Sequence, residues 1–333
     1  MRTWLLLVLA LTPARAQFPP APQPVAPQSP PATQQAPAPA EPSAEPATFT
    51  AGVSIVRVDA QVVDGRRVVG DLTKEDFEIL DQGASRPIEY FGREAEPLHL
   101  VLLLDVSGSM RKLLDQMAAA SKQALAQLKA GDSVAVFAFG RTSVVKVDFT
   151  SDMGDAAAAV GAARFEKEVG AGTLLNPAIV EAAQYIRDKS AGKPGRRALI
   201  VLTDNDSVNY QAPDQQALEA LYAADTVLNA IVIPGAKPPD AKKSSFANPD
   251  FSPADVFKLA RESGGEVIEA GKSGEGLREM IERIRTRYSL HYRAPDATTP
   301  GFHKIEVRLA PAARARFKKA EVRARAGYAV TGL

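Results

Sequence analysis

The stretch LVLLLDVSGSM, residues 100–110, decides the fold of this chain. Its unbroken apolar run is typical of a strand that is buried on both faces of a parallel sheet. Asp105, Ser107 and Ser109 follow at the carboxyl end of that strand, so three oxygen-bearing side chains come to one place. What these oxygens bind is the question that the rest of the sequence must answer.

Strands of the same kind alternate with helical sequence from residue 97 to residue 287. This alternation predicts an α/β fold with a doubly wound, mostly parallel six-stranded sheet in the order 3-2-1-4-5-6. Too few residues separate the second and third strands for a parallel crossover, so we expect the third strand to run antiparallel at an edge. The expected strands are LHLVLLL (98–104), SVAVFAFG (133–140), VVKVDF (144–149), RALIVLTD (197–204), TVLNAIVI (226–233) and EVIEA (266–270).

The sequence on either side of this region, residues 49–96 and 288–333, alternates apolar and polar residues as strands with one buried face do. Each flank is too short to form a stable domain alone. We therefore expect the two flanks to pair into one discontinuous β-rich domain, beside an α/β domain of residues 97–287.

The N-terminus has the features of an export signal. Residues 1–16 combine Arg2, a short apolar segment and the small-residue cleavage site ARA. Residues 17–48 consist almost wholly of Pro, Ala, Gln and Ser, which predicts a disordered linker. The apolar segment is too short to span a bilayer. We expect an exported protein, periplasmic or extracellular, without stable membrane insertion.

Composition narrows the choice of partner. The formal net charge is only +1 over 333 residues, which gives no reason to expect nucleic acid as a ligand. The chain has no cysteine, so no disulfide stabilises it.

The predicted strand order brings a second carboxylate to the first. Strands 1 and 4 are neighbours in that order, and they end at Asp105 and Asp204. The loop GAGTLLNP, residues 170–177, is expected to open on the same edge and offers Thr173. Two carboxylates and three hydroxyls, those of Ser107, Ser109 and Thr173, make an all-oxygen site. Such a site suits the hard cations Mg²⁺, Ca²⁺ and Mn²⁺, and it leaves the ion open to one more anionic ligand.

The motifs DVSGSM, GTLL and VLTDND, in this order and each at its expected element, resemble the von Willebrand factor type A domain and its metal-ion-dependent adhesion site. The flanks resemble those of a group of exported bacterial proteins built around this domain. The resemblance implies that the hydroxyls of Ser107, Ser109 and Thr173 touch the metal. It also implies that Asp105 and Asp204 act through water while they balance the charge of the metal.

One residue departs from the family pattern. The family usually has glycine after the second aspartate, where this chain has Asn205. Asparagine tolerates a left-handed turn, so we expect the loop to form, but its effect on metal affinity is left open. Asp206 adds a carboxylate to which the sequence assigns no role. We expect Mg²⁺ as the bound ion, with Mn²⁺ or Ca²⁺ as alternatives.

These observations predict a non-enzymatic, divalent-metal-dependent protein-binding module of the adhesion type. Its metal would clamp an acidic residue of a partner protein or peptide. The alternative is a structural or assembly component of the cell envelope in which the metal site is degenerate. Loss of partner binding in chelator would favour the module over the alternative.

The sequence does not match three common enzyme patterns. A dehalogenase-like phosphatase needs a second aspartate where Ser107 stands, and a nucleophile elbow needs glycine where Asp105 stands. SAGKPG, residues 190–195, does not form a P-loop. We therefore predict no catalytic residue and no residue that binds an organic cofactor. The three histidines, His99, His291 and His303, are expected to be structural.

Overall fold

The computed structural model describes residues 55–65, 67–93, 96–240, 250–271, 275–295 and 299–330. The predicted signal peptide of residues 1–16 and the predicted linker of residues 17–48 lie outside these described residues. Within the described ranges, no helix is both long and apolar enough to span a bilayer.

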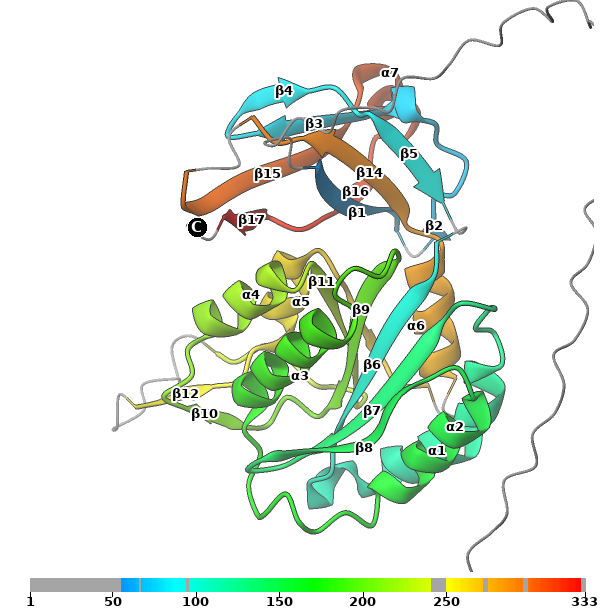
Figure 1. The fold of residues 1–333 in the computed structure, drawn as a ribbon, viewed down its shortest axis with the longest axis vertical. Helices are drawn as coiled ribbons and strands as arrows, with labels where there is room; N and C mark the ends of the chain where they lie inside the picture. The colour runs from blue at the N-terminus through cyan, green and yellow to red at the C-terminus, as the bar shows by residue number, and fades with distance from the viewer. Residues whose placement is uncertain are drawn as a thin grey trace, which may run out of the picture. The chain divides into compact units, whose positions relative to one another are not determined.

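A six-stranded sheet forms the centre of the α/β part, in the order β13-β11-β9-β6-β7-β8 (Figure 1). All neighbouring strands pair in parallel except β7 and β8, which are antiparallel. Read in chain order, this is the predicted order 3-2-1-4-5-6 with an antiparallel third strand at the edge, so the predicted fold class is confirmed. The strands are β6 (Leu98–Asp105), β7 (Ser133–Phe139), β8 (Ser143–Thr150), β9 (Arg196–Thr203), β11 (Thr226–Val232) and β13 (Val267–Glu269).

Helices cover both faces of this sheet, because the central strand β6 has apolar side chains on both faces. The strand is therefore buried along its whole length. Leu100, Leu102 and Leu104 pack with α1, α2 and α6 on one face. Val101 and Leu103 point to the other face and pack with α3, α4 and α5. The helices are α1 (Arg111–Leu125), α2 (Met153–Ala163), α3 (Leu175–Lys189), α4 (Asp214–Ala223), α5 (Val256–Ser263) and α6 (Gly276–Arg285), and the short 3₁₀ helix η2 (Gly108–Met110) precedes α1.

The two flanks pair with each other through antiparallel strands. A five-stranded sheet has the order β16-β1-β14-β5 with β2 on β1, and a four-stranded sheet has the order β17-β15-β3-β4. Their apolar side chains share one core. The strands are β1 (Ile55–Asp64), β2 (Arg67–Val68), β3 (Phe77–Asp81), β4 (Ala84–Arg86), β5 (Tyr90–Arg93), β14 (Tyr288–Arg293), β15 (Gly301–Leu309), β16 (Glu321–Arg323) and β17 (Gly327–Val330), with the helices η1 (Lys74–Asp76) and α7 (Pro311–Arg316).

Residues Thr50–Leu333 form one compact unit that contains both the paired flanks and the α/β part. The predicted boundaries, residues 49–96 and 288–333 for a β-rich domain and residues 97–287 for the α/β domain, stay a prediction.

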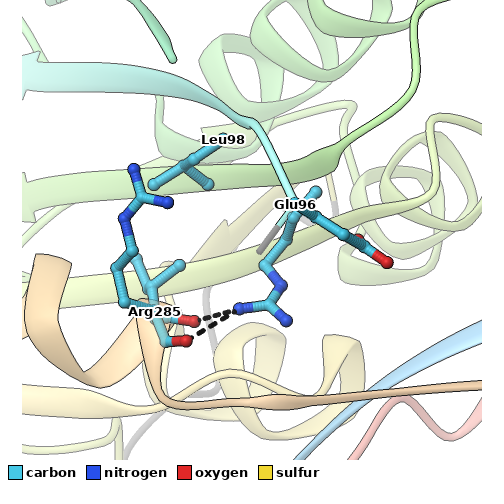
Figure 2. A pocket seen from close by; sticks show the side chains of 5 residues that line it. Glu96, Leu98 and Arg285 are labelled. Carbon is cyan, nitrogen blue, oxygen red and sulfur yellow. Dashed lines mark hydrogen bonds between the residues drawn. The ribbon is translucent and has the colours of Figure 1, made fainter. Parts of the chain in front are cut away.

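A buried polar cluster, which we call the polar joint and define as Arg57, Asp59, Arg196 and Ser289, connects the flank strands to the α/β part. Arg196 at the start of β9 donates to the Asp59 carboxylate over 3.2 Å and to the Ser289 hydroxyl over 3.1 Å. The same guanidinium also reaches the backbone oxygens of Ile284 and Arg285 at the end of α6 (Figure 2). Arg196 of β9 therefore forms hydrogen bonds to β1, β14 and α6.

One small element was not predicted from the sequence. Strand β10 (Val208–Tyr210) pairs antiparallel with β12 (Phe251–Pro253) into a two-stranded ribbon. The rings of Tyr210 and Phe251 lie 5.0 Å apart, centroid to centroid, on this ribbon. Strand β12 therefore closes the long segment between β11 and α5, of which residues 241–249 lie outside the described residues.

Candidate metal centre

Asp105 is the fully buried last residue of β6. Its Oδ1 accepts a hydrogen bond from the Ser107 backbone N–H over 2.9 Å, and its Oδ2 accepts one from the Thr203 hydroxyl over 3.0 Å. Burial, and to a lesser extent the charge of Asp204, outweigh the lowering effect of the hydrogen bonds and raise the pKa of Asp105 to about 6. The carboxylate is thus held in one orientation at the sheet edge, in a place that disfavours its negative charge.

The two serines connect Asp105 to Asp204. Ser107 and Ser109 lie on the turn through η2 into α1, and their hydroxyl oxygens are 3.1 Å apart. The Ser109 hydroxyl donates to Asp204 Oδ2 over 2.5 Å. Asp204 follows β9 directly, is 9% exposed and also accepts from the backbone N–H of Asp206 over 2.9 Å. The structure therefore brings four of the five predicted site residues together.

Thr173 lies in the half-buried loop that precedes α3. Leu174 donates its backbone N–H to the Gly140 carbonyl over 2.9 Å, which anchors the loop to the end of β7. A Cβ at Gly140 would lie 2.8 Å from the Gly170 oxygen and 3.1 Å from the Gly172 oxygen, so this close approach requires glycine. Thr173 thus shares the carboxyl edge of the sheet. No hydrogen bond among the described residues joins it to the other four predicted site residues.

Two further residues support the site: Thr203, which was not predicted from the sequence, and Asn205, which forms the expected left-handed turn. The Thr203 hydroxyl donates to Asp105 and accepts a hydrogen bond from the Asn205 backbone N–H over 3.1 Å. It therefore connects Asp105 to the loop that carries Asp204. Asn205 has a φ of 59°, the left-handed conformation. Its side chain accepts from the backbone N–H of Val256 over 2.9 Å and donates to the Lys237 carbonyl over 3.0 Å. The role of Thr203 could have been predicted from its position, because a hydroxyl directly before Asp204 lies close to the end of the neighbouring strand.

The donor set fits a hard divalent cation. Asp105 and Asp204 are both buried, and neither forms an ion pair with a basic side chain in the part of the chain that the structure describes. A serine hydroxyl that donates one hydrogen bond still has lone pairs for a cation. The described residues hold no cluster of three or more His, Cys, Asp or Glu side chains placed for a metal. A cation here would depend on two carboxylates and on hydroxyl oxygens.

The exposed Asp206 has no comparable place in the site. Only its backbone N–H contacts Asp204, and its side chain is exposed. The structure assigns no role to its carboxylate.

Comparison with solved structures found chains of similar fold at low sequence identity. An aerotolerance-related membrane protein from Bacteroides fragilis, crystallised with multiple mutations to serine, is 18% identical with a TM-score of 0.43, over 56% of this chain and 98% of that chain. The conserved hypothetical protein BatB from Bacteroides thetaiotaomicron is 17% identical with a TM-score of 0.43, over 56% of this chain and 97% of its own.

Proximal thread matrix protein 1 of the mussel byssus, in a form described as having a zinc-occupied MIDAS motif, is 15% identical with a TM-score of 0.41. That comparison covers 57% of this chain and 47% of the mussel protein. No curated protein sequence matches this chain.

A family model matches the part of the chain that carries the site. Residues 100–207 match the model described as von Willebrand factor type A domain. The matched range begins within β6 and extends beyond Asp204, so it includes all five predicted site residues. The chain therefore contains a von Willebrand factor type A domain.

Proposed function

We propose that this domain is a non-enzymatic protein-binding module of the adhesion type, and that a divalent cation at the carboxyl edge of its sheet clamps an acidic side chain of a partner. Mg²⁺ is the expected ion, with Mn²⁺ or Ca²⁺ as alternatives. The observation that carries the proposal is the pair of buried carboxylates, Asp105 and Asp204. They are linked through serine hydroxyls and have no basic partner among the described residues.

Each residue has a distinct role in this proposal. The hydroxyls of Ser107, Ser109 and Thr173 contact the ion, and Asp105 and Asp204 balance its charge. The bound ion supplies a positive centre that attracts a carboxylate from outside the chain. The hydrogen bonds from Thr203 and from the Ser107 backbone fix the orientation of Asp105. Because the site is fixed before binding, little conformational freedom would be lost when the ion enters.

The proposed place of action is outside the cytoplasm, either the periplasm or the extracellular space. The export signal read from residues 1–16 supports this part of the proposal. The expected partner is a protein or peptide that offers an acidic side chain, and neither nucleic acid nor stable membrane insertion is part of the proposed function.

Thermal unfolding of the purified protein tests the metal site. A ligand that binds only the folded state stabilises it by about 2.7 kcal/mol at a hundred times its dissociation constant. For a protein of this size we expect the unfolding midpoint to rise by roughly 5–10 °C when Mg²⁺ or Mn²⁺ is added after chelation. Asp105→Asn and Asp204→Asn should abolish the rise because each removes one of the two charges that hold the ion.

Asp206→Asn is the matched control, because it removes an exposed carboxylate two residues from Asp204 whose side chain does not contact the site. This variant should keep the full rise. A wild-type midpoint that does not change when Mg²⁺, Mn²⁺ or Ca²⁺ is added would contradict the proposal and favour the structural alternative. An equal rise in all four proteins would show that the metal binds elsewhere.

A further inference from the structure

A groove of about 370 Å³ opens directly beside the candidate metal centre. The residues that matter for its chemistry are Val106, Ser107, Arg111, Leu114, Phe165 and Lys167. We call it the Ser107 groove. Ser107 belongs both to the wall of this groove and to the predicted metal ligands, so the two sites are continuous.

The Ser107 groove combines a buried apolar floor with an exposed ring. Leu114 of α1 is 1% exposed and lies beneath the groove, whereas Phe165 is 69% exposed, an unusual state for a phenyl ring. The Arg164 guanidinium lies 4.5 Å from the centroid of the Phe165 ring, which restrains the ring from one side. The groove therefore offers an apolar side chain the exposed Phe165 ring and, on its wall, the half-buried Val106.

The segment that carries Phe165 is held in place by Glu166. Its Oε1 accepts the backbone N–H groups of Lys167 and Glu168 over 2.7 and 2.6 Å, and its other oxygen pairs with Lys146. Phe165 itself donates its backbone N–H to the Ala162 carbonyl over 3.0 Å at the end of α2. The ring and the Lys167 side chain are thus presented on a fixed turn.

The charges of the Ser107 groove do not cancel. Arg164 pairs with Asp115 over 2.9 Å, and Glu166 pairs with Lys146. Arg111 and Lys167 are exposed, and among the described residues neither side chain has a carboxylate partner. The groove is therefore positive on balance, even before a divalent cation beside it adds to the field.

We propose that the Ser107 groove binds the residues next to the partner's metal-binding carboxylate, and that these residues carry one apolar side chain and a second carboxylate. The apolar side chain packs against Phe165 and Val106, above the buried Leu114, and the second carboxylate pairs with Arg111 and Lys167. This inference rests on the proposed function, because it extends the same binding event beyond the metal. It defines the partner as an acidic segment with an apolar residue near its acidic side chains.

Selection from a phage-displayed library of random dodecapeptides tests this inference on the purified protein. Peptides are captured in Mn²⁺ or Mg²⁺ and eluted with chelator, so that only metal-dependent binders are recovered. We expect the recovered peptides to share two acidic residues and an aromatic or aliphatic residue close to them. A synthetic peptide of the recovered sequence then serves as the probe for affinity measurements.

Substitutions in the groove should weaken this peptide without affecting the metal. Phe165→Ala and Lys167→Glu should each reduce the affinity by about tenfold, the range expected when a central contact is truncated or its charge reversed. Lys112→Glu is the control for charge, since Lys112 is also exposed, follows Arg111 on α1 and does not line the groove. Phe302→Ala controls for loss of an exposed ring, because Phe302 is 47% exposed on β15. Both controls should bind the peptide as the wild type does.

The possible outcomes distinguish a failure of the groove inference from a failure of the proposed function. If the metal raises the unfolding midpoint and the peptides depend on metal, but the groove variants bind them normally, then the groove inference is wrong and the proposed function stands. If the metal raises the midpoint but no peptide is recovered, or the recovered peptides lack an acidic pair and an apolar residue, the groove inference also fails. If the metal has no effect on the midpoint, the proposed function fails and the groove inference fails with it.

Discussion

At the scale of single residues, Asn205 does more than replace a glycine. It accepts the left-handed conformation, with a φ of 59°, that glycine would adopt without strain. In addition, its amide connects the site loop to the first residue of α5 and to the Lys237 carbonyl. Compared with glycine at this position, Asn205 has less backbone freedom but forms two side-chain hydrogen bonds.

Substitutions at Asn205 should separate these two effects. Asn205→Gly should lower the free energy of unfolding by about 1–3 kcal/mol, because two hydrogen bonds are lost while the turn stays unstrained. Asn205→Ala should lower it by about 1 kcal/mol more, because alanine cannot form the bonds and is strained at positive φ. Urea unfolding in chelator measures both. If Asn205→Ala were as stable as Asn205→Gly, the left-handed turn would not persist in solution.

At the scale of elements, the junction of β7 with the loop before α3 controls the position of Thr173. Gly140 has no side chain, and this allows the oxygens of Gly170 and Gly172 to approach the end of the strand. A methyl group at this position would push that loop away from the sheet edge. The glycine is thus a structural requirement for the predicted third hydroxyl of the metal centre.

Gly140→Ala should therefore affect both stability and metal binding. We expect the free energy of unfolding to fall by about 1–3 kcal/mol, as for other cases of overpacking. The metal-induced rise of the unfolding midpoint should shrink because Thr173 is displaced. Gly161→Ala is the matched control, since no atom lies within 4 Å of its added Cβ in α2, and it should stabilise the helix by roughly 0.5–1 kcal/mol. A full metal response in Gly140→Ala would argue against a role for Thr173.

Elements with one dominant signal could be predicted from the sequence. The six sheet strands were predictable because the four central ones are compact apolar runs and because chain connectivity limits the order of all six. That order also explains why Asp105 and Asp204 could be predicted as neighbours, although their role as part of a metal site stays a prediction. The β10–β12 ribbon could not be predicted, because each strand has three residues and about 40 residues separate them.

The start of α3 shows how a distant contact can override a local signal. Asn176 followed by Pro177 has the local pattern of a helix cap, but α3 already begins at Leu175. The Asn176 side chain instead donates to the Ala212 carbonyl over 2.9 Å and to Asp214 over 3.1 Å. Its partners come from a segment more than 30 residues away, which no local pattern contains.

At the scale of the whole molecule, the polar joint connects the paired flanks to the α/β part by charge as well as by packing. Asp59 is 8% exposed and accepts hydrogen bonds from Arg196, Arg57 and Ser289. Burial alone would raise the pKa of Asp59, but Arg196 and Arg57 outweigh burial and hold the pKa well below its ordinary value of 3.8. Both arginines would lose their common counter-charge if this carboxylate were neutralised.

The joint should therefore make the stability of the molecule depend on acid pH. Because the pKa of Asp59 is lower in the folded state than in the unfolded state, its contribution is fully present above about pH 4 and declines as the pH falls below that value. Asp59→Asn should lower the free energy of unfolding by about 3–5 kcal/mol at neutral pH, since it leaves the buried Arg196 without its carboxylate partner, while Arg57 keeps its ion pair with Glu96. The gap between wild type and variant should narrow below about pH 4, because Asp59 of the unfolded wild-type chain then takes up a proton while the folded carboxylate stays charged, and this proton uptake favours unfolding. Urea unfolding at a series of pH values measures that gap, with Asp206→Asn as an exposed control that should show none. A gap that stays constant down to about pH 2 would contradict this prediction, because it would show that the charge of the Asp59 carboxylate does not stabilise the joint.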